Sequence, residues 1–176
     1  MSLDPALGPD DHTLGPDDAR MVLVQYGDFE CPYSFDVQKV IHEVREAFPD
    51  AVRYAFRHFP LRYHANALRA AIASEEAARQ GQFWAFYERL YAHQLQLRAD
   101  QLVAHADALG LDADAMQAAL DAETGKAEIL AQKKAGVRSG VRSTLNLWIN
   151  GQLFEEDALE EALVTHVIEP LKQATA

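Results

Sequence analysis

The chain has 176 residues, of which 49% are hydrophobic and 24% charged, ordinary values for a globular protein of one domain. Its 27 Asp and Glu outnumber its 16 Lys and Arg, so the formal net charge is −11. Such an acidic surface repels nucleic-acid phosphates and anionic lipids, and we expect neither as a partner. The single cysteine, Cys31, excludes an intrachain disulfide and any multi-cysteine metal cluster built from one chain.

No stretch approaches the roughly 18 consecutive apolar residues of a membrane-spanning helix. The N-terminus also lacks the basic and apolar regions of a signal peptide. The sequence therefore predicts a soluble, cytoplasmic protein.

The first third of the chain has the pattern of a βαβ unit. Residues 4–18 are rich in Asp, Gly and Pro and predict an extended lead-in rather than a secondary-structure element. Residues 21–26 are mostly apolar and β-prone, which predicts a buried strand. After Cys31 and Pro32, apolar residues recur at helical spacing as far as Phe48 and predict a helix.

Residues 51–59 alternate in polarity and predict the second strand of this unit. Val52, Tyr54 and Phe56 fall on one face, so the opposite face, with Ala55 and Arg57, is expected to be the wetter one. On the helix between the two strands, His42 lies off the apolar stripe and is expected to face solvent.

Residues 65–139 contain no convincing strand and predict a block of five helices inside the α/β frame. Gly110 has the position of a helix C-terminal stop, and Asp112 that of an N-cap. The apolar positions that mark the five helices are Leu68 and Ile72; Phe83, Phe86 or Tyr87, and Leu90; Leu102, Val103, Ala106 and Leu109; Met116 and Leu120; and Ile129 and Leu130. Phe83, Trp84, Phe86 and Tyr87 are expected to form the core of this block.

The last part of the chain predicts a β-hairpin followed by a helix. Asn150-Gly151 separates two β-prone runs, and this dipeptide suits a type I′ turn because both central residues need positive φ. Apolar residues from Leu159 to Leu171 have helical spacing, and the acidic residues of 155–161 would form the negative start of that helix.

Cys31 is the residue with the clearest chemical potential. It stands where a buried strand gives way to a helix, so free backbone N–H groups and the helix dipole favour its thiolate form. Asp28 and Glu30 oppose that effect unless their carboxylates face water. A buried, inert cysteine is the alternative.

The other candidate groups carry weaker signals. Ser34 lies one helical turn after Cys31. Its hydroxyl could donate to a thiolate, cap the helix or have no functional role. His58 and His64 are six residues apart, which is not a helical metal-binding spacing, so we expect no metal site.

Residues 27–34, Gly-Asp-Phe-Glu-Cys-Pro-Tyr-Ser, resemble the active-site segment of the DsbA-like thioredoxin-fold family. The resemblance implies an α/β thioredoxin-like fold with a central mixed sheet, in the order βαβ, helical insertion, β-hairpin and α. It implies one domain over residues 1–176, with the frame in 19–62 and 140–174 and the inserted helical subdomain in 63–139. Further segments that resemble the family are residues 11–16, 57–61, 68–71, 82–84, 140–141 and 148–151.

Two residues depart from the family's pattern. The family's motif is C-x-x-C, in which the second cysteine resolves the mixed disulfide formed by the first, and here Ser34 stands in that second position. Leu145 stands where the family has a cis-proline that faces the motif. A non-proline cis bond costs about 3–4 kcal/mol, so we expect a trans bond before Leu145 and an altered substrate groove. By the resemblance, Cys31 and Ser34 take the catalytic positions, and the substrate-binding positions are Pro32, Tyr33, Thr144 and Leu145.

Dithiol oxidation by this chain alone is excluded, because a lone thiolate cannot expel a bound substrate. The favoured hypothesis is a monothiol thiol–disulfide oxidoreductase that exchanges with a protein thiol or disulfide or with glutathione. The alternatives are a redox-inactive thioredoxin-fold binding module and a glutathione-conjugating enzyme of the kappa type that uses Ser34 or Cys31. We expect no bound cofactor, glutathione as a candidate co-substrate, and a monomer or homodimer.

Overall fold

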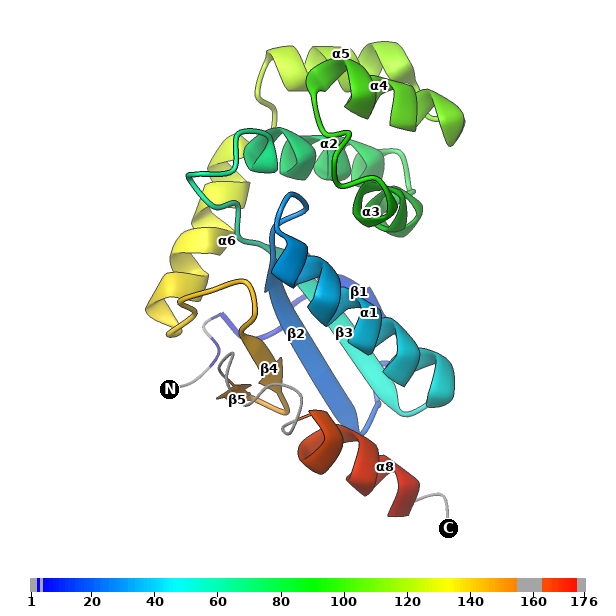
Figure 1. Ribbon diagram of the computed structural model, residues 1–176, viewed down its shortest axis with the longest axis vertical. Helices are drawn as coiled ribbons and strands as arrows, with labels where there is room; N and C mark the ends of the chain where they lie inside the picture. Colours follow the sequence, from blue (N-terminus) through cyan, green and yellow to red (C-terminus); the bar gives the residue numbers. More distant parts are fainter. Residues whose placement is uncertain (1–2, 4, 155–162, 174–176) are drawn as a thin grey trace. The chain divides into compact units, whose positions relative to one another are not determined.

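The structure is a computed structural model that describes residues 3, 5–154 and 163–173 (Figure 1). Its five strands form one sheet in the order β1-β3-β2-β4-β5. The strands are β1 (His12–Leu14), β2 (Met21–Gly27), β3 (Val52–His58), β4 (Leu147–Ile149) and β5 (Gln152–Phe154). The helices are α1 (Pro32–Ala47), α2 (Ala67–Arg79), α3 (Phe83–Ala92), α4 (Ala99–Ala108), α5 (Ala113–Asp121), α6 (Lys126–Arg138), the π-helical η2 (Val164–Ile168) and α8 (Glu169–Gln173).

The chain divides into two compact units. The first comprises Met1–Gly27, Asp36–Arg57 and Lys133–Ala176 and holds almost all of the sheet. The second comprises Asp28–Phe35 and His58–Gln132, so it contains the cysteine motif together with α2 to α5.

The predicted βαβ unit is confirmed. β2 and β3 are neighbours in the sheet and run in the same direction, with α1 as the crossover between them (Figure 1). β1 pairs antiparallel with β3, and β4 pairs antiparallel with both β2 and β5, which makes the sheet mixed. Along α1, His42 is exposed, as its place off the apolar stripe predicted.

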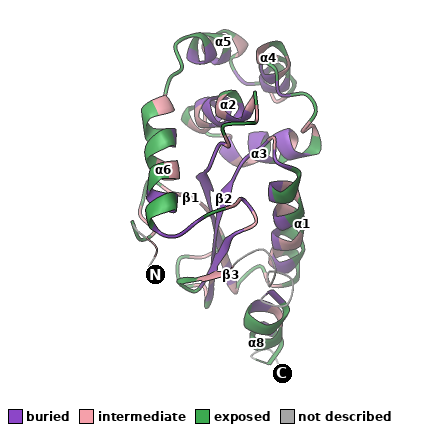
Figure 2. Cartoon of the chain, turned by 60° about the vertical axis from the view of Figure 1, so that its left-hand side comes forward, coloured by how far each residue is buried: buried purple, intermediate pink, exposed green. Residues whose placement is uncertain are grey.

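Two expectations for the first unit were wrong. Residues 12–14 form β1 instead of an unpaired lead-in, with Thr13 opposite Ala55. The second face of β3 is not wet, because Ala55 is 0% exposed and Arg57 3%. Arg57 can be buried because Asp11 and Tyr26 hydrogen-bond to its guanidinium, and β2 is likewise buried along nearly its whole length (Figure 2).

The hairpin was predicted correctly from its turn. Asn150 and Gly151 both have positive φ, 47° and 81°, and they connect β4 to β5. The Asn150 side chain also accepts a hydrogen bond from Val22 N–H at 2.8 Å, which ties the turn to β2. The acidic residues of 155–161, and Leu159, lie outside the described residues, whereas Leu163, Val167 and Leu171 of the closing helix are buried.

All five helices predicted between residues 65 and 139 are present. Gly110 ends α4 with a φ of 71°, and the Asp112 carboxylate accepts from Ala115 N–H as the N-cap of α5. The predicted core is largely correct: Phe83, Phe86 and Tyr87 are buried, and Trp84 is partly so. Among the described residues, no helix is long and apolar enough to cross a membrane.

Candidate active site

Cys31 immediately precedes α1, at the N-cap position of the helix. Its N–H donates to the Asp28 carbonyl at 3.1 Å, and its own carbonyl accepts from Phe35 N–H at 3.3 Å, the first hydrogen bond of the helix. Pro32 follows at the first helical position, where it has no N–H to leave unpaired. The residue is buried, with Cys31 only 2% exposed.

The Asp28 carboxylate fixes the loop that leads to Cys31. Its Oδ1 accepts from Glu30 N–H at 2.8 Å, and its Oδ2 accepts from Leu61 N–H at 2.8 Å. Oδ2 also lies 2.8 Å from Nδ1 of His64, and the Asp28 side chain is fully buried. The negative charge near the thiol is therefore balanced by three donors instead of by water.

Glu30, like Asp28, ties the loop before Cys31 to residues 61–66. Its carboxylate accepts from the backbone N–H of Asn66 at 2.6 Å and from Asn66 Nδ2 at 3.1 Å. Asn66 is the N-cap residue of α2, and its own side chain makes no capping bond there. Glu30 thus places negative charge at the positive end of α2, which is favourable. The Asp28 carboxylate does not face water, because its side chain is fully buried, whereas Glu30 is partly exposed.

Gln94, in the connection after α3, donates hydrogen bonds to two backbone carbonyls of the cysteine motif. Its Nε2 donates to the Phe29 carbonyl at 2.8 Å and to the Cys31 carbonyl at 3.0 Å. One side-chain amide therefore fixes two backbone oxygens of the loop. With Asp28 and Glu30, it leaves the backbone before the thiol little freedom to move.

The remaining motif residues differ in exposure. Ser34 is 0% exposed, and its Oγ accepts from Asp28 N–H at 3.0 Å. This hydrogen bond ties the start of the loop to the first turn of α1. Pro32 is exposed, and Tyr33 is 55% exposed. Cys31 and Ser34 are thus buried, whereas Pro32 and Tyr33 are exposed to solvent, and their place in a substrate site stays a prediction.

The other two predicted site residues, Thr144 and Leu145, belong to the first unit. Thr144 is buried, and Leu145 N–H donates to Ser143 Oγ at 3.2 Å. The Asn146 side chain accepts from the N–H groups of Arg142 and Ser143, at 2.7 and 3.0 Å. These bonds build a defined turn before β4, and its place in a substrate groove stays a prediction.

Tyr91, on α3, contributes a buried hydroxyl to the surroundings of the motif. Its ring centroid lies 5.1 Å from that of Phe29 and 6.1 Å from that of Phe35, so it packs between residues on either side of Cys31. Burial raises the pKa of the Tyr91 phenol well above its usual range, and Tyr87 and Asp28 raise it further. The group is therefore a neutral O–H donor at every physiological pH.

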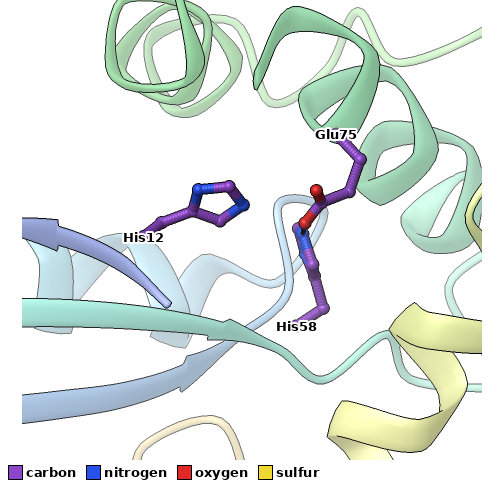
Figure 3. Close-up of side chains that lie close together, drawn as sticks. All are labelled: His12, His58 and Glu75. Carbon is purple, nitrogen blue, oxygen red and sulfur yellow. Dashed lines mark hydrogen bonds and ion pairs between the residues drawn. The ribbon is translucent and has the colours of Figure 1, made fainter. Parts of the chain in front are cut away.

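Buried His58 and partly exposed Glu75 form a further pair in the second unit. Figure 3 shows the Glu75 carboxylate, from α2, directed at the His58 ring, with Oε1 at 2.8 Å from Nε2. The His58 N–H is held in turn by the Gln132 side chain at 2.8 Å. The pair links the end of β3 to α2 and to α6.

Several of these residues were not predicted. Asp28 and Glu30 were considered only as charges, and His64, Asn66, Gln94 and Tyr91 were not singled out for the site. Their partners are 33 to 65 residues away in sequence, so no local pattern indicates them. The one usable signal is the pair of acidic residues in a turn before a buried thiol, since such carboxylates require donors.

Comparison with known proteins agrees with this geometry. The family described as thioredoxin matches residues 8–169. The structure of oxidised BdbD from Bacillus subtilis superposes with a TM-score of 0.79 at 22% identity, covering 92% of this chain and 93% of that one. Alpha-DsbA1 from Wolbachia pipientis gives a TM-score of 0.78 at 18% identity, covering 96% and 94%.

The curated relatives are longer proteins. A Na⁺/H⁺ antiporter, NhaA, of Herminiimonas arsenicoxydans is 34% identical over 176 residues, which is 99% of this chain but 28% of the antiporter. NhaA 1 of Mycolicibacterium gilvum is 52% identical over 85 residues, which is 48% of this chain and 14% of the antiporter. The chain therefore spans less than a third of these relatives. The family match over most of its length and the DsbA-like fold together place this chain in the thioredoxin family.

Proposed function

We propose that this chain performs thiol–disulfide exchange through Cys31 alone. The observation that carries the proposal is the placement of a single thiol at the N-terminus of α1, in a loop fixed by Asp28, Glu30 and Gln94, with Ser34 at the position of a resolving thiol. The two nearest carboxylates, those of Asp28 and Glu30, are each hydrogen-bonded to donors of their own.

The exchange has two steps. The Cys31 thiolate attacks a disulfide R–S–S–R′, so that a Cys31–S–S–R bond forms, the S–S bond of the substrate breaks, and R′–S⁻ leaves and takes up a proton. Because Ser34 cannot attack the mixed disulfide, a second thiol, R″–SH, must do so. That thiol releases Cys31 as the thiolate and departs as R–S–S–R″, so glutathione or a protein thiol completes each cycle.

The test is glutathione-dependent reduction of hydroxyethyl disulfide by the purified chain. Cys31→Ser should lower the rate to the uncatalysed background, whereas Ser34→Ala should retain measurable activity because the hydroxyl transfers no electrons. Ser34→Cys is the informative counterpart: after treatment with oxidised glutathione and removal of that reagent, it should hold a disulfide between Cys31 and the new thiol and should oxidise one equivalent of a dithiol substrate. Turnover that survives Cys31→Ser would overturn the proposal.

A second candidate function is a thioredoxin-fold binding module without turnover. The 2% exposure of Cys31 favours it, because a buried thiol is slow to meet a bulky disulfide. The curated relatives are Na⁺/H⁺ antiporters in which the matching region is a minor part. Such a module would therefore accompany a membrane transporter. Transport assays on an antiporter of this kind, with and without the chain added, would separate this role from turnover, since Cys31→Ser should leave a pure binding effect intact.

A further inference from the structure

The second unit contains a cavity that the exchange reaction does not use. It has a volume of about 370 Å³ and lies where α2, α4 and α5 pack against one another (Figure 1). Its lining residues come from these helices and from the turn after α5, outside the cysteine motif. Small-molecule sites in proteins have volumes of about 300–1,000 Å³, so this cavity is large enough for a small ligand.

Part of the cavity lining is aliphatic. Leu68 and Ile72 lie one turn apart on α2, and Leu120 lies at the end of α5. Ile72 is 1% exposed and Leu120 8%, whereas Leu68 is partly exposed. Ala99, the first residue of α4, adds only a small side chain to the lining. A branched aliphatic group in the cavity would bury apolar surface against these side chains, which is favourable.

The rest of the lining is charged and carries both signs. Arg69, on α2, is exposed, and its guanidinium forms no ion pair with another described residue. The carboxylates are those of Asp121, the last residue of α5, and Glu123, in the turn that follows. Asp121 accepts from Gln117 Nε2 at 2.8 Å, and a carboxylate can accept further hydrogen bonds. Glu123 pairs with Lys126 at 2.6 Å, but the two side chains are 54% and 41% exposed, so a ligand can replace this weak pair.

The turn that ends α5 fixes the backbone of both acidic residues. Thr124 N–H donates to the Ala119 carbonyl at 2.9 Å, and Lys126 N–H donates to the Glu123 carbonyl at 3.1 Å. Glu123 has a positive φ of 49°, the left-handed conformation that commonly reverses the chain after a helix. The backbone that carries the two carboxylates is therefore tied to α5, whose last turn also supplies the aliphatic Leu120.

We infer that this cavity binds a small zwitterion with a branched aliphatic side chain, that is, an α-amino acid of the leucine type. Arg69 holds its carboxylate, because a guanidinium binds a carboxylate through two parallel hydrogen bonds. Asp121 and Glu123 accept from its ammonium group, and the aliphatic lining buries its side chain. The two carboxylates disfavour a purely anionic ligand, and Arg69 disfavours a ligand with two cationic groups. The site goes beyond the proposed exchange, because it involves neither Cys31 nor a bond-forming step.

The test is a titration of the isotope-labelled chain with L-leucine, followed through the backbone amide signals in NMR spectra. Signals of residues around the cavity, in α2, α4 and α5, should shift saturably, with a dissociation constant in the millimolar range because the ligand is small. Isovalerate lacks the ammonium group of leucine, and isoamylamine lacks its carboxylate. Each should bind at least about fivefold more weakly than leucine, because each has lost one charged hydrogen-bonding group.

Two variants separate the charged groups of the cavity. Arg69→Gln should weaken the binding of leucine about fivefold and leave that of isoamylamine unchanged, whereas Asp121→Asn should weaken leucine and isoamylamine but not isovalerate. Both positions are exposed, so both variants should keep the spectrum of the folded chain. The matched controls are Arg62→Gln and Asp107→Asn, which change exposed charges of the same unit outside the cavity lining and should bind leucine as the wild type does. Cys31→Ser should also bind leucine normally, so the result is independent of the proposed exchange.

Three results would overturn the inference. The first is a lack of saturable shifts with leucine, or shifts confined to amides away from α2, α4 and α5. The second is equal affinity for leucine in wild type, Arg69→Gln and Asp121→Asn. The third is isoamylamine binding as tight as that of leucine, which would identify the cavity as a site for a simple cation.

Discussion

Each of the two units contains a buried charged side chain that ties a loop to the fold, but the two differ in sign and in surroundings. In the first unit the Arg57 guanidinium donates to the Asp11 carboxylate at 2.7 and 2.9 Å, to Tyr26 Oη at 2.9 Å, and to the carbonyls of Pro5 and Ala6. In the second unit the Asp28 carboxylate accepts from two backbone N–H groups and pairs with His64.

The difference shows how one buried charge can stabilise the fold and another can fix the loop that carries the thiol. Burial lowers the pKa of Arg57, but the hydrogen bonds from Asp11 and Tyr26 outweigh it and raise that pKa above its usual range. Arg57 is therefore charged at any pH at which the protein is folded. Asp28 instead places a negative charge three residues before the thiol. Its charge is balanced by donors that also fix the loop, so anchoring and electrostatic balance are achieved by the same bonds.

The largest effect is expected from Arg57→Met. The substitution leaves Asp11, Tyr26 and two carbonyls without their shared donor, and loss of one partner of a buried ion pair costs about 3–5 kcal/mol. Urea unfolding should show this loss in the free energy of unfolding. Arg53→Met is the matched control, because the carboxylate of Asp17 opposite Arg53 is 91% exposed and such a pair contributes under about 1 kcal/mol. An equal loss of unfolding free energy in the two variants would show that the buried contacts of Arg57 do not stabilise the fold more than an exposed ion pair does.

Asp28→Asn should have the next largest effect. The amide keeps the shape but loses the charge, and it turns an NH₂ group toward donors, so we expect a loss of about 2–3 kcal/mol in the free energy of unfolding. Hydrogen exchange at Glu30 and Leu61 N–H should accelerate, which locates the effect in the loop. Asp36→Asn, on the exposed Asp36–Lys39 pair of α1, should cost about 0.5 kcal/mol or less. Unchanged exchange at both amides would contradict the role given to Asp28.

Gln94→Ala tests the hydrogen bonds to the Phe29 and Cys31 carbonyls in the same loop. It removes two neutral hydrogen bonds from a partly exposed side chain, and we expect a loss of about 1–2 kcal/mol. Alkylation of Cys31 by iodoacetamide should become several-fold faster, because the loop that buries the thiol loses a tether. Gln96→Ala, an exposed position nearby, should change neither quantity. If Cys31 in Gln94→Ala reacts at the wild-type rate, Gln94 does not control access.

The smallest effect concerns pH. Burial lowers the pKa of His105, which in its neutral form accepts from Arg89 Nε at 3.1 Å and donates to the Gln96 carbonyl at 3.0 Å. The unfolded state therefore takes up the proton first as pH falls below about 6.5. Stability should decline from there until the folded state is also protonated, and it should be constant above that pH. His105→Gln should flatten this slope in unfolding experiments at pH 5 to 8, whereas His42→Gln, on an exposed part of α1, should not.

The sequence predicts the frame well because its signals are local. The apolar run of β2, the spacing in α1, the Asp112 cap and the positive φ at Asn150-Gly151 all act within a few residues. β1 was missed because it has only three residues and pairs with β3, which lies far from it in the sequence. The burial of Arg57 was missed because its partners Asp11 and Tyr26 also come from distant parts of the chain. For the site, Cys31 and Ser34 follow from the motif. Gln94 and His64 could not be predicted, because their contacts with the motif join residues 36 to 65 positions apart.

The reactivity of Cys31 in the folded chain tests the proposed exchange chemistry most directly. The folded protein and a urea-unfolded sample would be incubated with glutathione disulfide at neutral pH, and the mass of the chain followed over time. We predict that the folded chain forms one glutathione adduct, on Cys31, and that the adduct persists until a thiol is added. An adduct that forms only in the unfolded chain would contradict this chemistry and identify Cys31 as a buried, inert thiol.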